Sequence, residues 1–120
     1  MVFGIDYSFN MNKLHLATLY VNELKARLIV TNPDHFTRVE GRRFPGNGCL
    51  VQSLLLTTGL KLGEFGKEGE PGTYDLIGKP NPYALRLVQH DHNLAASSKT
   101  VMIGDNPKTD VMFGKNGGVD

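Results

Sequence analysis

Two carboxylates that could take part in chemistry lie in the stretch Thr100-Val-Met-Ile-Gly-Asp-Asn-Pro-Lys-Thr-Asp110. Residues 101–103 are all apolar and predict a short buried strand, and Pro107 predicts that a helix starts soon afterwards. In an α/β fold, ligands bind at the carboxyl ends of such strands. Asp105 lies at that end and Asp110 lies in the first helical turn, so the two acids could hold a hard cation such as Mg²⁺.

The same stretch also has a purely structural interpretation. The sequence Gly-Asp-Asn-Pro, residues 104–107, is a favourable turn sequence. The helix dipole would stabilise Asp110 in the first helical turn without any ligand. The spacing alone therefore leaves both interpretations open, a cation site and a structural turn.

A second strand and turn precede the acidic stretch, in Tyr74-Asp-Leu-Ile-Gly-Lys-Pro-Asn-Pro-Tyr83. Residues 74–77 predict another short strand, and Lys79 follows it directly. A lysine at the end of one strand and Asp105 at the end of the next could converge on one site of the size of a phosphate group. This second motif favours a phosphate site over a simple turn.

Several elements must position these residues. Helical spacing predicts helices over 10–24, 50–58, 81–90 and 109–115, and short apolar runs predict strands over 2–6 and 27–31. Two apolar stripes are expected to be buried: Leu14, Ala17, Val21 and Leu24 in the first helix, and Ala84, Leu87 and Val88 in the third. Alternation of strands and helices indicates an α/β fold.

The long segment from Asn32 to about Asn47 predicts a loop, because it holds two prolines and two glycines. Asn32 and Asp34 could donate to and accept from a polar substrate, although an Asx-type turn explains them equally well. His35 is expected to contact the substrate as well, although a single histidine in a loop is more often a plain surface residue.

Residues 61–73 are rich in glycine and charge and predict a mobile linker. The glycines at 63, 66 and 69 are regularly spaced, but no Gly-Lys-Ser/Thr ending follows them. The acidic residues Glu64, Glu68 and Glu70 would also repel a phosphate group. The segment is therefore not a phosphate-binding loop.

The composition describes an ordinary globular protein of 120 residues, with 40% hydrophobic and 21% charged residues. A net charge of +1 gives no reason to expect a nucleic acid or a membrane surface as partner. The single Cys49 cannot form a disulfide within the chain, and the sequence shows no leader peptide and no apolar run of membrane length. We expect a cytoplasmic protein.

Taken in order, several motifs resemble the haloacid dehalogenase superfamily of phosphatases, in the branch of 4-nitrophenylphosphatase, phosphoglycolate phosphatase and pyridoxal phosphatase. The resemblance in the second half rests on Gly78-Lys79-Pro80, on residues 102–110, and on Phe113-Gly-Lys-Asn-Gly-Gly118. Three motifs of the first half are similar to the large C2-type cap of that branch: Gly4-Ile-Asp6, Val30-Thr-Asn-Pro-Asp34 and Pro45-Gly-Asn-Gly48.

This resemblance implies an α/β architecture of two parts. Residues 1–73 would form most of a C2-type α/β cap that sets substrate specificity, with the linker at 61–73, and residues 74–120 would form the C-terminal part of a Rossmann-like core. The loop at 32–47 would face the active site, and the cap would mediate homodimer contacts. Because such a core sheet would lack its first strands, we expect the isolated chain to be marginally stable or self-associating.

The resemblance also implies a set of catalytic roles. An aspartate nucleophile and a second aspartate two residues later would attack phosphorus and transfer protons. Lys79 would neutralise the phosphoryl oxygens, Asp105 would take Mg²⁺, and Asp110 would hold a metal-bound water or orient Lys79. The substrate would be a small phosphorylated metabolite, bound also by Asn32, Asp34 and His35.

The chain contains no Asp-x-Asp sequence, and the aspartate that follows the first predicted strand, Asp6, has Ser8 two residues later. The expected function is therefore that of a Mg²⁺-dependent phosphomonoester phosphatase of the phosphoglycolate or 4-nitrophenylphosphate type, inactive as an isolated chain. The alternative is a non-catalytic binding or dimerisation module. A receiver-type signalling domain is disfavoured, because its phosphorylated aspartate precedes the Lys-Pro strand, whereas Lys79 precedes Asp105.

Overall fold

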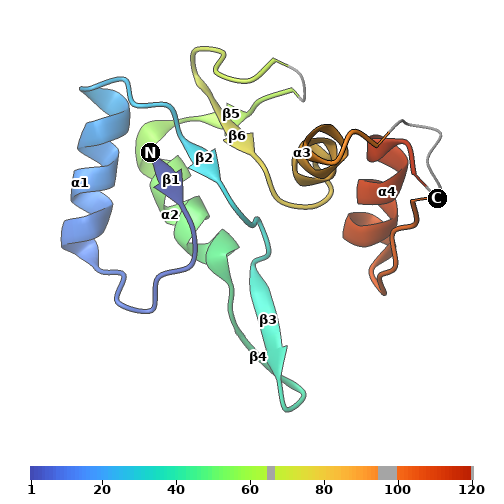
Figure 1. The fold of residues 1–120 in the computed structure, drawn as a ribbon. Helices are drawn as coiled ribbons and strands as arrows, with labels where there is room; N and C mark the ends of the chain where they lie inside the picture. Colours follow the sequence, from blue (N-terminus) through green and yellow to red (C-terminus); the bar gives the residue numbers. More distant parts are fainter. Residues whose placement is uncertain (65–66, 95–99, 120) are drawn as a thin grey trace. The chain divides into compact units, whose positions relative to one another are not determined.

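The computed structural model describes residues 1–64, 67–94 and 100–119. They divide into two compact units, Met1–Leu76 and Ile77–Asp120 (Figure 1). Throughout these described ranges, no helix is long and apolar enough to cross a membrane.

The first unit is built on a four-stranded sheet in the order β1-β2-β6-β5. All three pairings are parallel, with Val2 opposite Ile29 and Ile29 opposite Asp75. The strands are short: β1 (Val2–Phe3), β2 (Ile29–Val30), β5 (Lys61–Leu62) and β6 (Thr73–Leu76). The parallel order confirms the predicted α/β class, because parallel strands need crossover connections such as helices.

Two helices of this unit pack against each other, α1 (Met11–Asn22) and α2 (Asn47–Thr58). The helix α1 begins where predicted, because the Asn10 side chain accepts a hydrogen bond from the Lys13 backbone N–H at 3.1 Å. The helix α2 ends at Gly59, whose left-handed conformation (φ 70°) suits glycine. Both helices contribute buried residues to the core that they share with the sheet.

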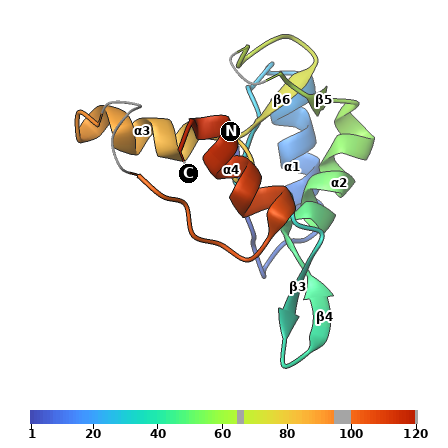
Figure 2. The ribbon, with the colours of Figure 1, turned by 90° about the vertical axis from the view of Figure 1, so that its right-hand side faces the viewer.

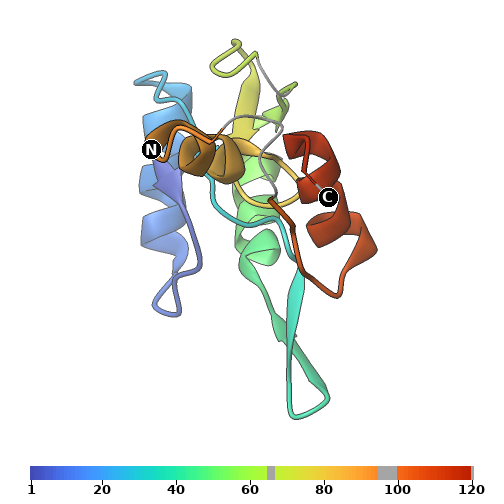
Figure 3. The same cartoon turned by 45° about the vertical axis from the view of Figure 1, so that its right-hand side comes forward.

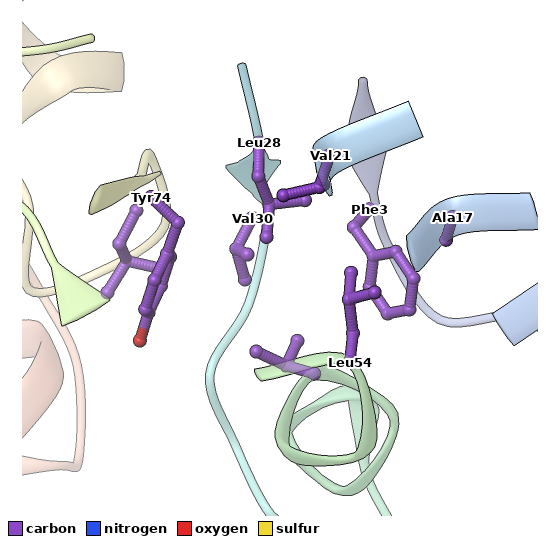
Figure 4. Close-up of a cluster of buried hydrophobic side chains, with 9 residues drawn as sticks. Phe3, Ala17, Val21, Leu28, Val30, Leu54 and Tyr74 are labelled. Atoms are coloured by element: carbon purple, nitrogen blue, oxygen red, sulfur yellow. The ribbon is translucent and has the colours of Figure 1, made fainter. Parts of the chain in front are cut away.

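The core of the first unit lies where the sheet strands meet these helices (Figure 4). Leu28 and Val30 from the region of β2 and Leu54 from α2 are completely buried. The predicted stripe of α1 is buried at Ala17 and Val21 and partly buried at Leu14, but the prediction for Leu24 is wrong. Leu24 lies beyond the last turn of α1, so it no longer follows the buried face and is exposed.

A β-hairpin occupies the segment that the sequence predicted as a loop. Its strands are β3 (Phe36–Val39) and β4 (Arg42–Pro45), joined by Glu40 and Gly41, which both have the positive φ that a type I′ hairpin turn requires. All the strand residues are exposed, and the hairpin extends away from α1 and α2 (Figure 2). The Arg43 guanidinium lies over the Phe36 ring, 4.5 Å from its centroid.

The predicted linker also contains ordered structure, since its first two residues form β5 and pair with β6, which begins at its last residue. Residues 65–66 lie outside the described ranges. The strand β6 belongs to the sheet of the first unit, so this unit extends to Leu76 rather than to residue 73. The buried Asp75 holds residues 67–73 against β6. Its carboxylate accepts hydrogen bonds from Arg27 Nε at 2.5 Å and from the Gly69 backbone N–H at 3.2 Å. The cap and core roles of the two units stay predictions.

The second unit contains α3 (Tyr83–Asp91), a π-helical turn η1 (Pro107–Val111) and α4 (Met112–Gly117), with α3 in contact with α4 (Figure 3). The predicted buried stripe of α3 is wrong: Ala84, Leu87 and Val88 are exposed, and Leu85 is buried instead. Gly117 explains the difference, because its missing side chain leaves the space that Leu85 fills.

The predicted strand at 101–103 does not form, and residues 101–104 run as irregular chain towards η1 and α4. Val101 and Ile103 are 64% and 88% exposed, while Met102 packs beside Gly114 of α4. A strand requires a neighbour that shares its backbone hydrogen bonds. No strand pairs with this segment in the part of the chain that the structure covers, which explains why its apolar side chains remain uncovered.

Candidate functional site

The second unit brings together two of the predicted site residues, Lys79 and Asp110. Lys79 lies in the turn that follows β6, and its Nζ donates to Oδ1 of Asp110 in the π-helical turn. The Asp110 carboxylate is only 7% exposed, whereas the Lys79 side chain is half exposed. The ammonium group is therefore anchored on one side and accessible on the other, although the catalytic roles of both residues stay predictions.

The Asp110 carboxylate is held by backbone groups as well as by Lys79. Its Oδ2 accepts a hydrogen bond from the Asn106 backbone N–H at 3.1 Å. The hydrogen bond from Lys79, then that from Asn106, hold the pKa of Asp110 below its usual value, and the Asp105 backbone N–H adds to the effect. Asp110 is thus ionised at neutral pH, and its oxygens are bonded to the Lys79 ammonium and to backbone N–H groups rather than being open to solvent.

The turn around Asp110 depends on close packing. Any side chain at Gly104 would overlap the Asp110 side chain, so glycine is required for this approach. Asn106 closes the turn, because its side chain accepts from the Lys108 backbone N–H at 2.9 Å while its own N–H binds Asp110. The local sequence Gly-Asp-Asn-Pro therefore builds a rigid cradle for one carboxylate.

Sequence reasoning missed Asn116, which reaches the lysine turn from α4. Its Nδ2 donates to the Pro80 carbonyl oxygen at 3.0 Å, directly beside the Lys79–Pro80 peptide bond. The partner is a backbone carbonyl 36 residues away, so no spacing in the sequence could have revealed the contact. Asn116 thus links α4 to the turn that carries Lys79.

Asp105 offers a single carboxylate to a cation. The residue is exposed, and carboxylate oxygen is the donor type that Mg²⁺ prefers. Among the residues with described positions, no group of three potential metal-ligating side chains occurs. The kind of donor fits Mg²⁺, but the number falls short of a complete site, because Asp110 already serves Lys79.

The predicted substrate contacts Asn32, Asp34 and His35 lie in the first unit. The Asn32 Oδ1 accepts from the Asp34 backbone N–H at 2.6 Å, which is the Asx-type turn of the alternative interpretation. The Asp34 carbonyl accepts from the Gly48 N–H at 2.8 Å, and both Asp34 and His35 are exposed. Lys79, Asp105 and Asp110 lie in the second unit, so a joint role in binding one substrate stays a prediction.

Comparisons with known proteins agree with the predicted family. Residues 76–120 match the family described as HAD-hydrolase-like, where HAD denotes haloacid dehalogenase. This match contains the lysine turn, the acidic turn and α4. The matched segment thus coincides with the second unit almost completely.

The whole chain is similar to bacterial phosphatases. It is 33% identical over 120 residues to the acid sugar phosphatase of Staphylococcus epidermidis, covering 100% of this chain and 41% of that protein. It is 35% identical over 124 residues to the 5′-nucleotidase YutF of Bacillus subtilis, with the same two coverages. The chain therefore spans about two-fifths of the length of these curated relatives.

Solved structures give the same result. A Bacillus subtilis protein described as a p-nitrophenyl phosphatase matches with a TM-score of 0.81 and 33% identity, over 99% of this chain and 41% of that one. The p-nitrophenyl phosphatase of Archaeoglobus fulgidus matches with a TM-score of 0.77 and 27% identity, again over 99% and 41%. The chain is a relative of the haloacid dehalogenase-type phosphatases, which confirms the resemblance and the α/β fold expected from the sequence.

Proposed function

We propose that the chain provides the lysine and acidic-turn part of a phosphomonoester hydrolase site that acts on a small phosphorylated metabolite. The observation that carries this proposal is the half-exposed Lys79 ammonium held by the buried Asp110 carboxylate. The relationship to phosphatases supports it, because the same residues lie in the matched segment.

Lys79 is suited to bind a phosphate group. Its ammonium group carries a fixed charge, and Asp110 prevents the side chain from sampling other directions. A phosphoryl group that approaches the accessible side would gain a charge-assisted hydrogen bond. The same positive charge would counter the negative charge that develops in the transition state.

Asp105 is the proposed Mg²⁺ ligand. When bound, Mg²⁺ would neutralise phosphate charge and orient the ester for displacement. With one protein carboxylate available, we expect a weak affinity for Mg²⁺ in the absence of a bound phosphate group. Asp105 would thus depend on the phosphate group itself for the remaining ligands.

Substrate choice is proposed to depend on Asn32, Asp34 and His35, following the family resemblance. Asp34 and His35 expose their side chains next to the hairpin of β3 and β4. The relatives are named for sugar phosphates and nucleotides, so we propose only the class of small phosphorylated metabolites. The proposed compartment is the cytoplasm, and the first unit is the proposed site of homodimer contacts.

We propose further that the chain binds phosphate esters without hydrolysing them, because no Asp-x-Asp sequence occurs in it. The required nucleophile and general acid would both be carboxylates of that motif. The same observation favours the second candidate function, a non-catalytic binding or dimerisation module. The two candidates differ in whether Lys79 binds phosphate.

The test combines turnover and binding of 4-nitrophenyl phosphate, with Mg²⁺, by the 120-residue chain and by Lys79→Ala. We expect no release of 4-nitrophenolate from either, and binding, detected by saturation-transfer NMR, in the unmodified chain alone. Turnover that Lys79→Ala abolishes would disprove the proposed inactivity and make Lys79 catalytic. Equal binding by both proteins, or none, would support the binding or dimerisation module instead.

A further inference from the structure

A cavity of about 500 Å³ lies in the first unit, at the edge of the sheet where three parallel strands begin. Among the residues that line it, Arg27 lies two residues before β2, Leu60 directly precedes β5, and Thr73 is the first residue of β6. Lys79 follows the other end of β6, and none of the candidate-site residues lines the cavity. Small-molecule sites have volumes of about 300–1,000 Å³, so this cavity can hold a small ligand.

Arg27 presents a positioned cation to this cavity. Its Nε donates to the Asp75 carboxylate at 2.5 Å, and the Asp75 side chain is 6% exposed whereas that of Arg27 is 50% exposed. Donation through Nε leaves both Nη groups for a ligand, and a guanidinium can bind a carboxylate through two parallel hydrogen bonds. Asp75 therefore positions Arg27 much as Asp110 positions Lys79.

The loop that leads into β6 forms one wall of the cavity. Gly69 and Gly72 have φ values of 85° and 79°, a region that glycine adopts without strain. The Gly69 N–H donates to Oδ1 of Asp75 at 3.2 Å, while Arg27 bonds to Oδ2 of the same carboxylate. One buried carboxylate thus holds both the cation and the loop beside it.

Charges of both signs surround the cavity. Lys25 and Arg27 supply two cations, while Glu70 supplies an anion in addition to the buried Asp75. Glu70 is held in the loop by Thr73, whose N–H and hydroxyl donate to its carbonyl oxygen at 3.2 and 2.8 Å. Because the four charges cancel and Glu70 repels anions, a doubly charged phosphate group gains little here. A ligand that carries one charge of each sign matches this arrangement.

The remaining wall of the cavity is apolar. Val21 belongs to the buried core and Leu60 packs against that core, and Ala26 and Pro71 extend the apolar surface. An aliphatic side chain placed here would remove its own surface and that of the cavity from water. The wall therefore favours a ligand with an aliphatic part beside its charged groups.

We propose that this cavity binds a free aliphatic α-amino acid. Its carboxylate bonds to the Nη groups of Arg27 and its ammonium group bonds to Glu70. Its side chain lies on the surface of Val21 and Leu60. This ligand uses no residue of the candidate site, so the proposal stands whether or not Lys79 binds phosphate.

The test is isothermal titration calorimetry of the full 120-residue chain with L-leucine. Two analogues each lack one charged group: isocaproate lacks the ammonium group, and isopentylamine lacks the carboxylate. We expect leucine to bind and both analogues to bind about tenfold or more weakly, because each leaves a charged group of the cavity without its partner. Inorganic phosphate should not displace leucine, and Lys79→Ala should bind leucine as the unmodified chain does.

NMR locates the binding site independently of its affinity. Leucine should shift the amide signals of Gly69 and Gly72, because both residues line the cavity. Leucine binding that leaves these two signals unchanged would place the ligand elsewhere and overturn the proposal.

Glu70→Gln removes the anion of the cavity at an exposed position. It should weaken leucine binding about fivefold or more and leave isocaproate binding unchanged or tighter, whereas general damage to the cavity would weaken both. The matched control Glu40→Gln makes the same change in the hairpin turn and should bind leucine as the unmodified chain does.

Arg27→Lys tests the guanidinium. The lysine keeps a cation beside the buried Asp75, which an alanine would leave unpaired at a large cost in stability. Leucine binding should fall about tenfold or more, because an ammonium group cannot replace the paired Nη donors. If Arg27→Lys fails to fold by circular dichroism, Glu70→Gln decides. No binding of leucine, equal binding by Glu70→Gln and Glu40→Gln, or an analogue or phosphate that binds as tightly as leucine would each overturn the proposal.

Discussion

Replacing Gly104 with alanine perturbs the candidate site at its tightest point. The added methyl group would overlap the Cβ, the carboxyl carbon and Oδ2 of Asp110. Asp110 is only 5% exposed, so its side chain has little room to move aside. Gly104 does not have a positive φ, so alanine can adopt its backbone conformation without strain. Any destabilisation must therefore come from the overlap of the methyl group with Asp110.

The sign of the change in the free energy of unfolding distinguishes a steric overlap with Asp110 from the usual consequence of replacing a glycine with alanine. Where the methyl group fits, replacing glycine with alanine stabilises a protein by about 0.4–1 kcal/mol through the unfolded chain. Overpacking a filled site costs about 1–3 kcal/mol. We therefore expect Gly104→Ala to lower the free energy of unfolding by about 1–2 kcal/mol, with Asp110 displaced from Lys79.

The assay is urea unfolding followed by the NMR amide signals of α4, together with an NMR titration of the Asp110 carboxyl. The unfolding midpoint should fall by about 1 M, given a urea dependence of about 1–3 kcal/mol per M, and the pKa of Asp110 should rise. The control Gly4→Ala faces the Thr31 hydroxyl at 3.1 Å, which can rotate away, so its effect should stay within about 0.5 kcal/mol. Unchanged or increased stability of Gly104→Ala would show that the space between Gly104 and Asp110 can take a methyl group.

Three further predictions concern the two units. Leu54→Ala should destabilise the first unit by about 2–5 kcal/mol in urea unfolding, because Leu54 is completely buried, and an effect below about 1 kcal/mol would contradict the assigned core. Asn10→Ala should cost about 1 kcal/mol through loss of the α1 cap, whereas Asn10→Ser should restore most of it. Folding lowers the pKa of Asp110, so its contribution to stability is present above its unfolded pKa near 3.8 and is lost as the pH falls through its lower folded value. The free energy of unfolding, measured between pH 2 and 5, should therefore depend less on pH in Asp110→Asn than in the unmodified chain.

The contact between Lys79 and Asp110 follows from the family resemblance, whereas the residues alone predict that Lys79 and Asp105 converge on one site. Lys79 and the acidic turn each follow an apolar run, and Asp110 stands in a turn with strong local signals. Hydrogen bonds between neighbouring residues, such as those of Asn106 with Lys108 and Asp110, form the acidic turn, so its residue types predict it. The contact from Asn116 could not be anticipated, because it joins a side chain to a distant backbone carbonyl.

The hairpin of β3 and β4 escaped prediction for a different reason. Its residues are exposed on both faces, so the alternation of apolar and polar residues that signals a half-buried strand is absent. Phe36 contacts Arg38 and Arg43 rather than a core. The positive φ values at Glu40 and Gly41 show that the turn, not burial, establishes this hairpin.

The run at 101–103 illustrates the limit of reading burial from composition. Three successive apolar residues predicted a buried strand, yet Val101 and Ile103 are exposed. Strand formation depends on a neighbouring strand, and the sequence of one segment carries no information about whether such a neighbour is present. Residues 101–103 lack a strand partner in the described part of the chain and form no strand, whereas β5 forms because β6 pairs with it.

We propose above that Lys79, held by Asp110, binds a phosphate group. Isothermal titration calorimetry of the 120-residue chain with inorganic phosphate tests it most directly, beside Lys79→Ala and the control Lys115→Ala, which removes an exposed lysine from α4. We expect phosphate to bind to the unmodified chain and to Lys115→Ala, and the affinity for phosphate to fall at least tenfold in Lys79→Ala. Equal affinity of Lys79→Ala and the unmodified chain would contradict the claim.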